Sequence, residues 1–315
     1  MYHPDPTTER VYTDVVVPFT IEGRDVRGRI TRLSAVSTDV IERHGYPDAV
    51  SALLGEALAL TALLGSMLKF EGIFTLQAAG DGPVKTLVTD FATASGADGK
   101  VSIGGIVRGY ARFDADAIAQ LKGNTLSDLT GRGYLALTLD QGKHMERYQG
   151  IVELDAASLD QSARNYFMNS EQLPSEIITR CRRVDTKDGP RWVAASLLLQ
   201  HLPASGGQSK STDAGDAAEN WQHARALMQT ITDDELLNPD LSLHDTLFRL
   251  FHEDGVRVFA PAHLTIGCRC NEERLRRVIA TFSAADQKDM AKDGVIAATC
   301  EFCKTEYTFK LSDFA

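Results

Sequence analysis

Residues 268–303 read CRCNEERLRRVIATFSAADQKDMAKDGVIAATCEFC, a stretch that opens with a CxC pair and closes with a CxxC pair. It contains four of the five cysteines of the chain: Cys268, Cys270, Cys300 and Cys303. Two close pairs of thiols are the ligand pattern of a tetrahedral zinc site. The alternatives are four free core cysteines or two structural disulfides, and free cysteines would not be expected to fall into pairs by chance. We therefore predict that these four residues bind one zinc ion.

The residues around these pairs favour thiolates. Four thiolates on Zn²⁺ carry a net charge near −2, and five cations lie close in sequence to offset it: Arg269, Arg274, Arg276, Arg277 and Lys304. Asn271 is predicted to cap a helix that directs its positive N-terminus at Cys268 and Cys270. One face of this helix should carry Leu275, Val278, Ile279 and Phe282. The site is either a closed structural zinc knuckle or a redox switch, because each pair is spaced to close into a disulfide.

The size of this segment indicates what oxidation would do. About fifty residues are near the lower limit for a fold held by core burial alone. Structural zinc contributes roughly 10–16 kcal/mol in comparable small modules, whereas a disulfide that closes even about 15 residues contributes only about 3 kcal/mol. Two disulfides over shorter loops cannot replace the metal, so oxidation should unfold the segment.

Upstream of the cysteines, residues 15–202 alternate strand-like and helix-like runs with many hairpin-length gaps. The pattern predicts an α+β domain with a mostly antiparallel sheet. Pro18 predicts that the strand Val15–Phe19 lies at a sheet edge. Further strands are expected at 27–32, 74–79, 85–90, 101–107, 134–139, 148–154, 177–182 and 192–200, and helices at 37–43, 47–70 and 156–168.

One run resembles a membrane span by length. Residues 49–68 read AVSALLGEALALTALLGSML, but Glu56 lies near the middle, where a carboxylate is costly in lipid. Pro47 and Asp48 open the run as they open an ordinary helix. We predict a core helix rather than a membrane span. The first twenty residues carry four charged residues and lack the apolar region of a signal peptide, so a cytoplasmic protein is expected.

The composition changes after Pro203. Residues 204–219 read ASGGQSKSTDAGDAAE, which offers no large apolar side chain to bury and predicts a flexible linker. Two short amphipathic helices should follow, and they need a surface to pack against. Their stripes are Trp221, Ala224, Met228 and Ile231 in the first, and Leu243, Leu247, Leu250 and Phe251 in the second. The expected organisation is an N-terminal α+β domain (1–203), a flexible and helical linker (204–262) and a small C-terminal zinc domain (263–315).

Other candidate sites are weaker. A net charge of −10 argues against binding nucleic acid. Gly80-Asp81-Gly82-Pro83 lacks the Lys-Ser/Thr of a phosphate-binding loop and predicts a turn. His263 lies near Cys268, but a complete Cys₄ set leaves it no ligand position. Cys181 has no nearby cysteine and is expected to be a structural or surface thiol rather than a catalytic nucleophile. No catalytic motif is present, so the chain is not expected to be an enzyme.

Several short motifs together resemble a known family. They are Gly80–Pro83, Glu146-Arg147-Tyr148-Gln149-Gly150, Tyr166-Phe167-Met168, Ser170-Glu171-Gln172-Leu173-Pro174, Leu197-Leu198-Leu199-Gln200, the stretch 247–258, and the CxC and CxxC pairs. In this order, from about Val15 to the C-terminus, they are similar to the 33 kDa chaperonin family, the redox-regulated holdases of bacteria. This chain departs from the family pattern in Cys181 and in a longer Gly/Ser/Asp-rich start of the linker.

The resemblance implies a function and a mechanism. It implies a cytoplasmic, ATP-independent chaperone that is inactive while zinc is bound to Cys268, Cys270, Cys300 and Cys303. Peroxide with unfolding stress would join Cys268 to Cys270 and Cys300 to Cys303 and release the zinc. The linker would then unfold, the protein would form a homodimer, and it would hold unfolding client proteins until ATP-dependent foldases take them over.

Two other classes of function remain as alternatives. One is a thiol-disulfide oxidoreductase that uses the CxxC pair Cys300–Cys303. Such a pair is expected within a thioredoxin-like βαβ unit. The other is a constitutive zinc-ribbon adaptor, whose binding to a folded partner would not depend on peroxide.

Overall fold

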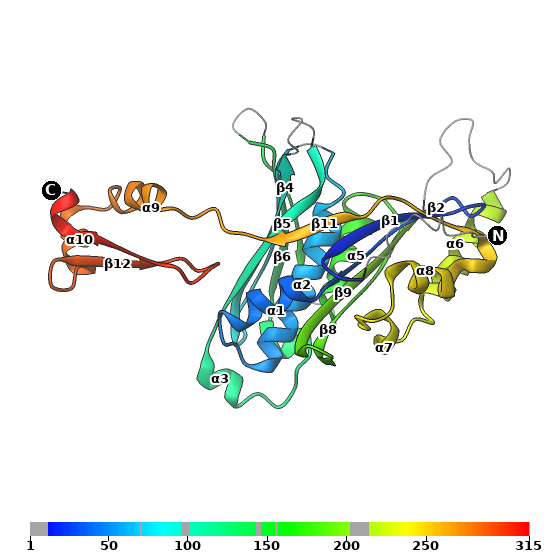
Figure 1. Ribbon diagram of the computed structural model, residues 1–315, viewed down its shortest axis with the longest axis horizontal. Coiled ribbons are helices and arrows are strands. Elements are labelled where there is room, and N and C mark those ends of the chain that lie inside the picture. The colour runs from blue at the N-terminus through cyan, green and yellow to red at the C-terminus, as the bar shows by residue number, and fades with distance from the viewer. Residues whose placement is uncertain are drawn as a thin grey trace. The chain divides into compact units, whose positions relative to one another are not determined.

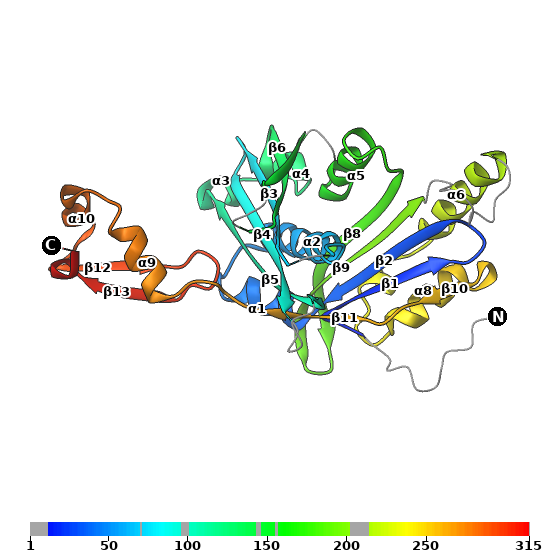
Figure 2. The same cartoon turned by 90° about the horizontal axis from the view of Figure 1, so that it is seen from above.

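The computed structural model describes residues 12–69, 71–95, 101–142, 146–154, 157–201 and 214–314. The chain divides into two compact units, Met1–Ile266 and Gly267–Ala315. The first unit contains a large sheet with helices on both of its faces (Figures 1 and 2). The second unit is small and contains the four clustered cysteines.

An 11-stranded sheet forms the framework of the first unit in the described part of the chain (Figure 1). Its order is β7-β6-β3-β4-β5-β11-β1-β2-β9-β8, and β10 also pairs with β1. All neighbours run antiparallel except β5 and β11, which are parallel. The prediction of an α+β fold with a mostly antiparallel sheet is confirmed. The strands are β1 (Val15–Ile21), β2 (Val26–Leu33), β3 (Ile73–Gly80), β4 (Val84–Ser95), β5 (Val101–Phe113), β6 (Gly133–Asp140), β7 (Tyr148–Glu153), β8 (Ser175–Thr186), β9 (Gly189–His201), β10 (Val256–Val258) and β11 (Ala262–Ile266).

Strand β1 is an interior strand, so the prediction that Pro18 marks a sheet edge is wrong. One side of β1 pairs with β2 along its whole length. The other side pairs with β11 at Val15 and Val16 and with β10 from Phe19 to Ile21. Pro18 lies between these two pairings, where no N–H donor is needed. A proline is therefore tolerated inside the sheet because the partner strand changes at its position.

Helix α2 (Asp48–Gly65) is the core helix that the sequence predicts. It lies in the hollow of the curved sheet, with strands on several sides of it (Figure 2). It is the one described helix that is long and apolar enough to cross a membrane. Of its 18 residues, 78% are buried inside the protein. It ends at Gly65 rather than Phe70, and a side chain at Gly65 would overlap the ring of Phe91. The other helices of this domain are α1 (Ala35–Glu42), α3 (Ala115–Ala119), α4 (Leu126–Thr130) and α5 (Leu159–Asn169).

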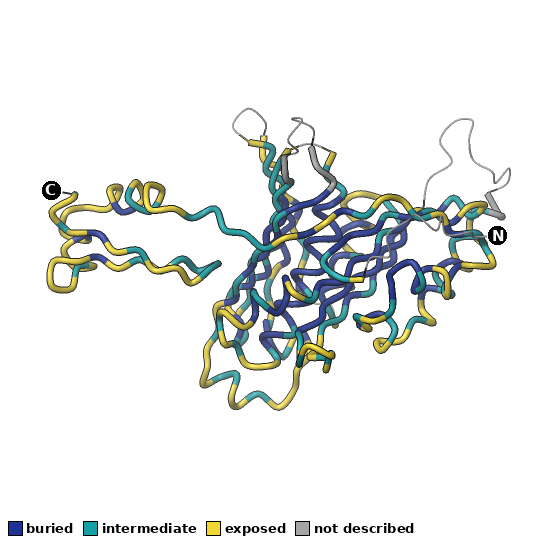
Figure 3. The backbone as a smooth tube through the Cα atoms, in the orientation of Figure 1, coloured by how far each residue is buried: buried dark blue, intermediate teal, exposed yellow. Residues whose placement is uncertain are grey.

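The opposite face of β1, β2 and β9 is covered by the predicted linker. Its helices are α6 (Ala214–Met228), α7 (Asp233–Leu236) and α8 (Leu243–Phe251), followed by a 3₁₀ turn, η1 (His252–Asp254). Met228, Leu247 and Phe251 are completely buried against sheet residues such as Phe19. Figure 3 shows this buried layer in dark blue. The predicted amphipathic stripes therefore pack on the sheet, whose apolar face they cover.

The expectation of an unstructured run at 204–219 is wrong for its second part. Residues 204–213 lie outside the described residues, but α6 already begins at Ala214. The segment Ala214–Glu219 contains three alanines and a glutamate, which are good helix formers, and it extends a helix whose later turns are docked. Helix α7 and the strands β10 and β11 were not predicted from the sequence.

The second unit packs two short helices against a hairpin. Its elements are α9 (Glu272–Ile279), α10 (Ala284–Met290), β12 (Val295–Thr299), β13 (Glu306–Lys310) and the 3₁₀ turn η2 (Leu311–Phe314). Its fully buried apolar core consists of Ile279, Ile296 and Phe309. The helix face predicted for α9 is only half right, because Val278 and Phe282 are 49% and 43% exposed. So small a core leaves much of the stability of the unit to other interactions.

Candidate metal centre and the linker contacts

The four cysteines of the second unit lie at the ends of its elements. Cys268 and Cys270 precede α9, and Cys300 and Cys303 lie in the turn between β12 and β13. This turn is closed by two backbone hydrogen bonds: the Cys300 amide donates to the Thr305 carbonyl (2.9 Å), and the Lys304 amide donates to the Cys300 carbonyl (2.8 Å). Lys304 adopts a positive φ of 58°, which reverses the chain after the CxxC pair. Two separate chain segments thus bring their thiols to one place.

The four sulfur atoms form a compact cluster. All of them lie within 4.8 Å of one another. The Sγ atoms of Cys268 and Cys300 are 3.6 Å apart, and those of Cys270 and Cys303 are 3.4 Å apart. Four ligands at about 2.3 Å from a tetrahedral metal are separated by about 3.8 Å. The cluster therefore has the dimensions and the donor set of a Cys₄ site for a soft divalent metal such as zinc.

The predicted electrostatic support is present only in part. Asn271 caps α9 as expected, and its side-chain oxygen accepts a hydrogen bond from the Arg274 amide (2.7 Å). Arg276, however, pairs with Glu272 and Asp313, each at 3.0 Å. Arg277 lies 3.6 Å from Glu273. These two arginines therefore neutralise carboxylates, and the expectation that they serve the thiolates is wrong.

Local hydrogen bonds make the thiols unequal. Burial opposes ionisation of Cys303, but the hydroxyl and backbone amide of Thr305 lower the pKa of this thiol to about 6. Burial raises the pKa of Cys270 to about 12, partly offset by a hydrogen bond with Tyr307. Burial also raises the pKa of Cys300. The hydrogen bonds from Thr305 therefore favour the thiolate of Cys303, whereas burial favours the neutral thiols of Cys270 and Cys300.

The other residues considered in the sequence lie elsewhere. Burial raises the pKa of Cys181 well above its ordinary value, and the sulfur packs where a side chain on Gly55 would be. His263 is an exposed residue of β11 and does not belong to the group of described residues that could hold a metal ion. Asp81 accepts a hydrogen bond from the Arg132 amide (2.8 Å), so Gly80–Pro83 is a packed turn, as predicted.

A buried arginine, not identified from the sequence, contacts the linker. Arg32 on β2 has no exposed surface. Its guanidinium donates to the carbonyls of Leu236 (2.8 Å), Glu235 (3.0 Å) and Leu241 (2.5 Å). Burial lowers the pKa of Arg32 to about 10, so the group stays charged at neutral pH. Carbonyls at the end of α7 carry the partial negative charge of the helix C-terminus, and they balance this buried cation.

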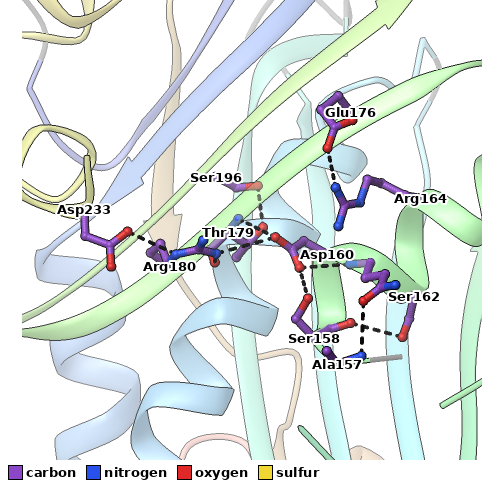
Figure 4. A network of polar contacts seen from close by, with 11 residues as sticks. Ala157, Ser158, Asp160, Ser162, Arg164, Glu176, Thr179, Arg180, Ser196 and Asp233 are labelled. Atoms are coloured by element: carbon purple, nitrogen blue, oxygen red, sulfur yellow. Dashed lines mark hydrogen bonds and ion pairs between the residues drawn. The ribbon is translucent and has the colours of Figure 1, made fainter. Parts of the chain in front are cut away.

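Ion pairs add further contacts between the linker and the sheet. Figure 4 shows Arg180 of β8 between Asp160 of α5 (3.6 Å) and Asp233 of α7 (3.0 Å). Glu176 of β8, which is almost fully buried, pairs with Arg225 of α6 at 2.8 Å. Glu176 and Arg180 are four residues apart on β8, so both lie on the same face of the strand. Neither they nor Arg32 carry a sequence signal, because their partners are distant in the chain.

Comparisons with known proteins agree on one family. A family model described as Hsp33 protein matches residues 14–310. The 33 kDa chaperonin of Caulobacter vibrioides is 41% identical over 302 residues, covering 94% of this chain and 95% of the relative. The 33 kDa chaperonin of Azotobacter vinelandii is 36% identical over 305 residues, covering 96% and 93%. The crystal structure of the 33 kDa chaperonin from Thermotoga maritima matches with a TM-score of 0.73 and 21% identity over 96% of each chain, which shows a shared fold.

Proposed function

The chain belongs to the Hsp33 protein family, and from this premise we propose that it is a redox-regulated, ATP-independent holdase chaperone of the cytoplasm. In the reduced state Cys268, Cys270, Cys300 and Cys303 hold one zinc ion and the protein does not bind clients. Residues 1–203 form the client-binding and dimerisation domain, residues 204–262 the linker, and residues 263–315 the redox switch. The observation that carries the proposal is the cluster of four Sγ atoms within 4.8 Å.

The chemistry of activation follows from the thiols. Each pair, Cys268–Cys270 and Cys300–Cys303, gives two electrons to one molecule of hydrogen peroxide. One S–S bond forms, the O–O bond breaks, and two hydroxide ions leave, each of which takes a proton from solvent to become water. A disulfide carries no negative charge, so the oxidised sulfurs can no longer hold a divalent cation. A bound zinc ion would tie Cys268 and Cys270 to the β12–β13 turn, and oxidation removes this tie.

The apolar face beneath the linker supplies the binding surface in this proposal. Met228, Leu247 and Phe251 cover sheet residues such as Phe19 and Leu197. Release of the linker would expose both of these apolar surfaces to water, and such surfaces bind unfolded chains. The exposed face would also support a homodimer. No step uses ATP, and the bound clients would pass to ATP-dependent foldases.

The two alternatives have less support. A thiol-disulfide oxidoreductase places its CxxC pair at the start of a helix, where the helix N-terminus lowers the thiol pKa. Here Cys300 and Cys303 lie between β12 and β13. A constitutive adaptor has no need for a linker that covers an apolar face. We propose no catalytic activity for this protein.

The test is suppression of aggregation of a chemically denatured client by the full chain, before and after treatment with peroxide. Metal content and free thiols are measured in the same samples. We expect suppression only after peroxide, together with loss of one zinc and four thiols per chain. Insulin reduction by the untreated protein would support the oxidoreductase instead. Equal suppression by the reduced and oxidised proteins would contradict redox control.

A further inference from the structure

Among the described residues, two hydroxyl groups contact the thiol cluster, and each contacts a different sulfur. The Tyr307 hydroxyl lies 3.4 Å from Sγ of Cys270. The Thr305 hydroxyl lies 3.2 Å from Sγ of Cys303. When the cysteines hold a metal they are thiolates and have no proton to donate, so each hydroxyl must donate to its sulfur. Both distances suit a hydrogen bond to sulfur, whose radius exceeds that of oxygen.

Tyr307 is held in place far more firmly than Thr305. Its backbone pairs with Ala298 across the β12–β13 hairpin. Its ring packs against the core of Ile279, Ile296 and Phe309. Thr305 is an exposed residue of the turn, so water can replace its hydroxyl. A tyrosine with its ring in a core and its hydroxyl at a polar group directs that hydroxyl at a fixed point.

A donated hydrogen bond changes the reactivity of a thiolate. Peroxide is attacked by a sulfur lone pair, and this lone pair carries the charge that the hydrogen bond stabilises. The stabilisation is lost as the S–O bond forms, so the hydrogen bond raises the barrier to oxidation.

We propose that Tyr307 is a positioning residue that restrains oxidation of Cys270 by donating a hydrogen bond to its sulfur in the metal-holding state. This inference rests on the proposed redox function. In the step concerned, Sγ of Cys270 attacks one peroxide oxygen, the S–O bond forms, and the O–O bond breaks to release hydroxide. Sγ of Cys268 then attacks the sulfenic sulfur, and the second hydroxide leaves as the S–S bond forms. Tyr307 thereby sets how much oxidant is needed to begin the switch.

The test compares Tyr307→Phe with Thr308→Val in the full-length protein. The first substitution removes only the hydroxyl at the cluster. The second removes a hydroxyl from the next residue of β13, which is exposed. Two quantities are measured: the rate of metal release under excess peroxide, followed with a chromogenic chelator, and the S→Co²⁺ charge-transfer band of the cobalt-substituted proteins.

We expect Tyr307→Phe to release metal about three- to tenfold faster than the unmodified protein. Its charge-transfer band should move to lower energy, because the sulfur lone pair is no longer stabilised. Thr308→Val should leave both quantities unchanged. An unchanged rate with an unchanged band in Tyr307→Phe overturns the inference and leaves the proposed function standing. Failure of the unmodified chain to bind cobalt or zinc overturns the proposed function itself.

A second variant covers the case in which Tyr307→Phe does not fold. Site-specific incorporation of 3-fluorotyrosine at position 307 keeps the size of the ring and makes the hydroxyl a stronger donor. We expect slower metal release and a band at higher energy, opposite in sign to the phenylalanine variant. Faster release with the stronger donor would contradict the inference.

Discussion

At the scale of single residues, the most unusual feature is a charged side chain buried without an acidic partner. Arg32 has no ion pair among the described residues, and linker carbonyls supply most of its hydrogen bonds. Removing one partner of such an arrangement leaves buried groups unsatisfied, at a cost of about 1–3 kcal/mol each. When the linker leaves, water can hydrate the guanidinium. Arg32 therefore favours a linker that is either fully docked or fully released.

The first prediction concerns this contact. Arg32→Met should release the linker in a fraction of reduced molecules, because the carbonyls of Glu235, Leu236 and Leu241 lose their donor. Limited proteolysis of residues 214–254 measures the release, and client binding under reducing conditions should rise with it. Arg27→Met is the matched control, since Arg27 lies on the same strand but is exposed and binds Gln200. Equal proteolysis of the two variants would show that Arg32 does not hold the linker.

The second prediction concerns Glu56 of α2. Burial and the charges of Asp160 and Asp233 raise the pKa of Glu56 to about 8, against the lowering effect of Arg180; Cys181 is the other titratable neighbour. The folded state binds the proton of Glu56 more tightly than the unfolded state does. Protonation of Glu56 therefore stabilises the fold fully at a pH below the unfolded pKa, which is near 4.5. The effect should then decline by up to about 1.4 kcal/mol per pH unit until pH 8.

Glu56→Gln should remove this dependence. The difference in the free energy of unfolding between the variant and the unmodified protein should shift in favour of the variant as the pH rises from 4.5 to 8. Above pH 8 this difference should stay constant. Urea unfolding across this range measures the effect, with exposed Glu42→Gln as the control. If the free energy of unfolding depends on pH in the same way in the unmodified protein and in Glu56→Gln, Glu56 does not cause the pH dependence.

At the scale of elements, the sequence predicts well where periodicity is strong. Helix α8 has the predicted bounds, Leu243–Phe251, because its four apolar residues recur at helical spacing. Helix α7 was missed because it has only four residues and is held in place by Arg32 and Arg180, which lie far away in the sequence. Strand β10 is three residues long and exists through its pairing with β1. Elements that depend on long-range contacts leave no local pattern.

The third prediction tests the docked helices. Met228→Asp or Leu247→Asp places a charge at a site with no exposed surface, and burial of an unpaired charge costs several kcal/mol. The linker should therefore undock while the metal stays bound. We expect aggregation suppression under reducing conditions with an unchanged zinc content. Ala226→Asp, on the exposed side of α6, is the control and should stay inactive. If the buried variants act only after peroxide, the linker is a passive tether.

At the scale of the whole molecule, the two units differ in what holds them together. The first has two extensive apolar cores, one on each face of the sheet, whereas the second has three fully buried apolar side chains. The paired cysteines predicted a cluster that could hold a metal ion from sequence alone, because ligand spacing is local. The hydroxyl of Tyr307 could not be placed beside Cys270 in this way, since that contact requires the register of the β12–β13 hairpin.

The fourth prediction follows from this difference. Removal of the metal by a chelator under reducing conditions should unfold residues 267–315 and leave the sheet of the first unit intact. Structural zinc contributes roughly 10–16 kcal/mol, as much as the whole stability of a typical domain. Hydrogen exchange of peptides from β12 and β13 measures the loss, with peptides from β4 as the internal reference. Persistent protection of β12 and β13 without metal would contradict the prediction.

Strand β11 has a consequence for the synthesis of the protein. Ala262 pairs with Val16 and Leu264 pairs with Gly105, so one late segment joins the two halves of the sheet. At about 5–20 residues per second, a ribosome needs roughly 10–50 s to extend the chain from Val16 to Ala262. Until then β1, and β5 once it has been made, each have one unpaired edge, and such edges attract other chains. Each new copy of the chain thus passes through an aggregation-prone stage before its sheet is complete.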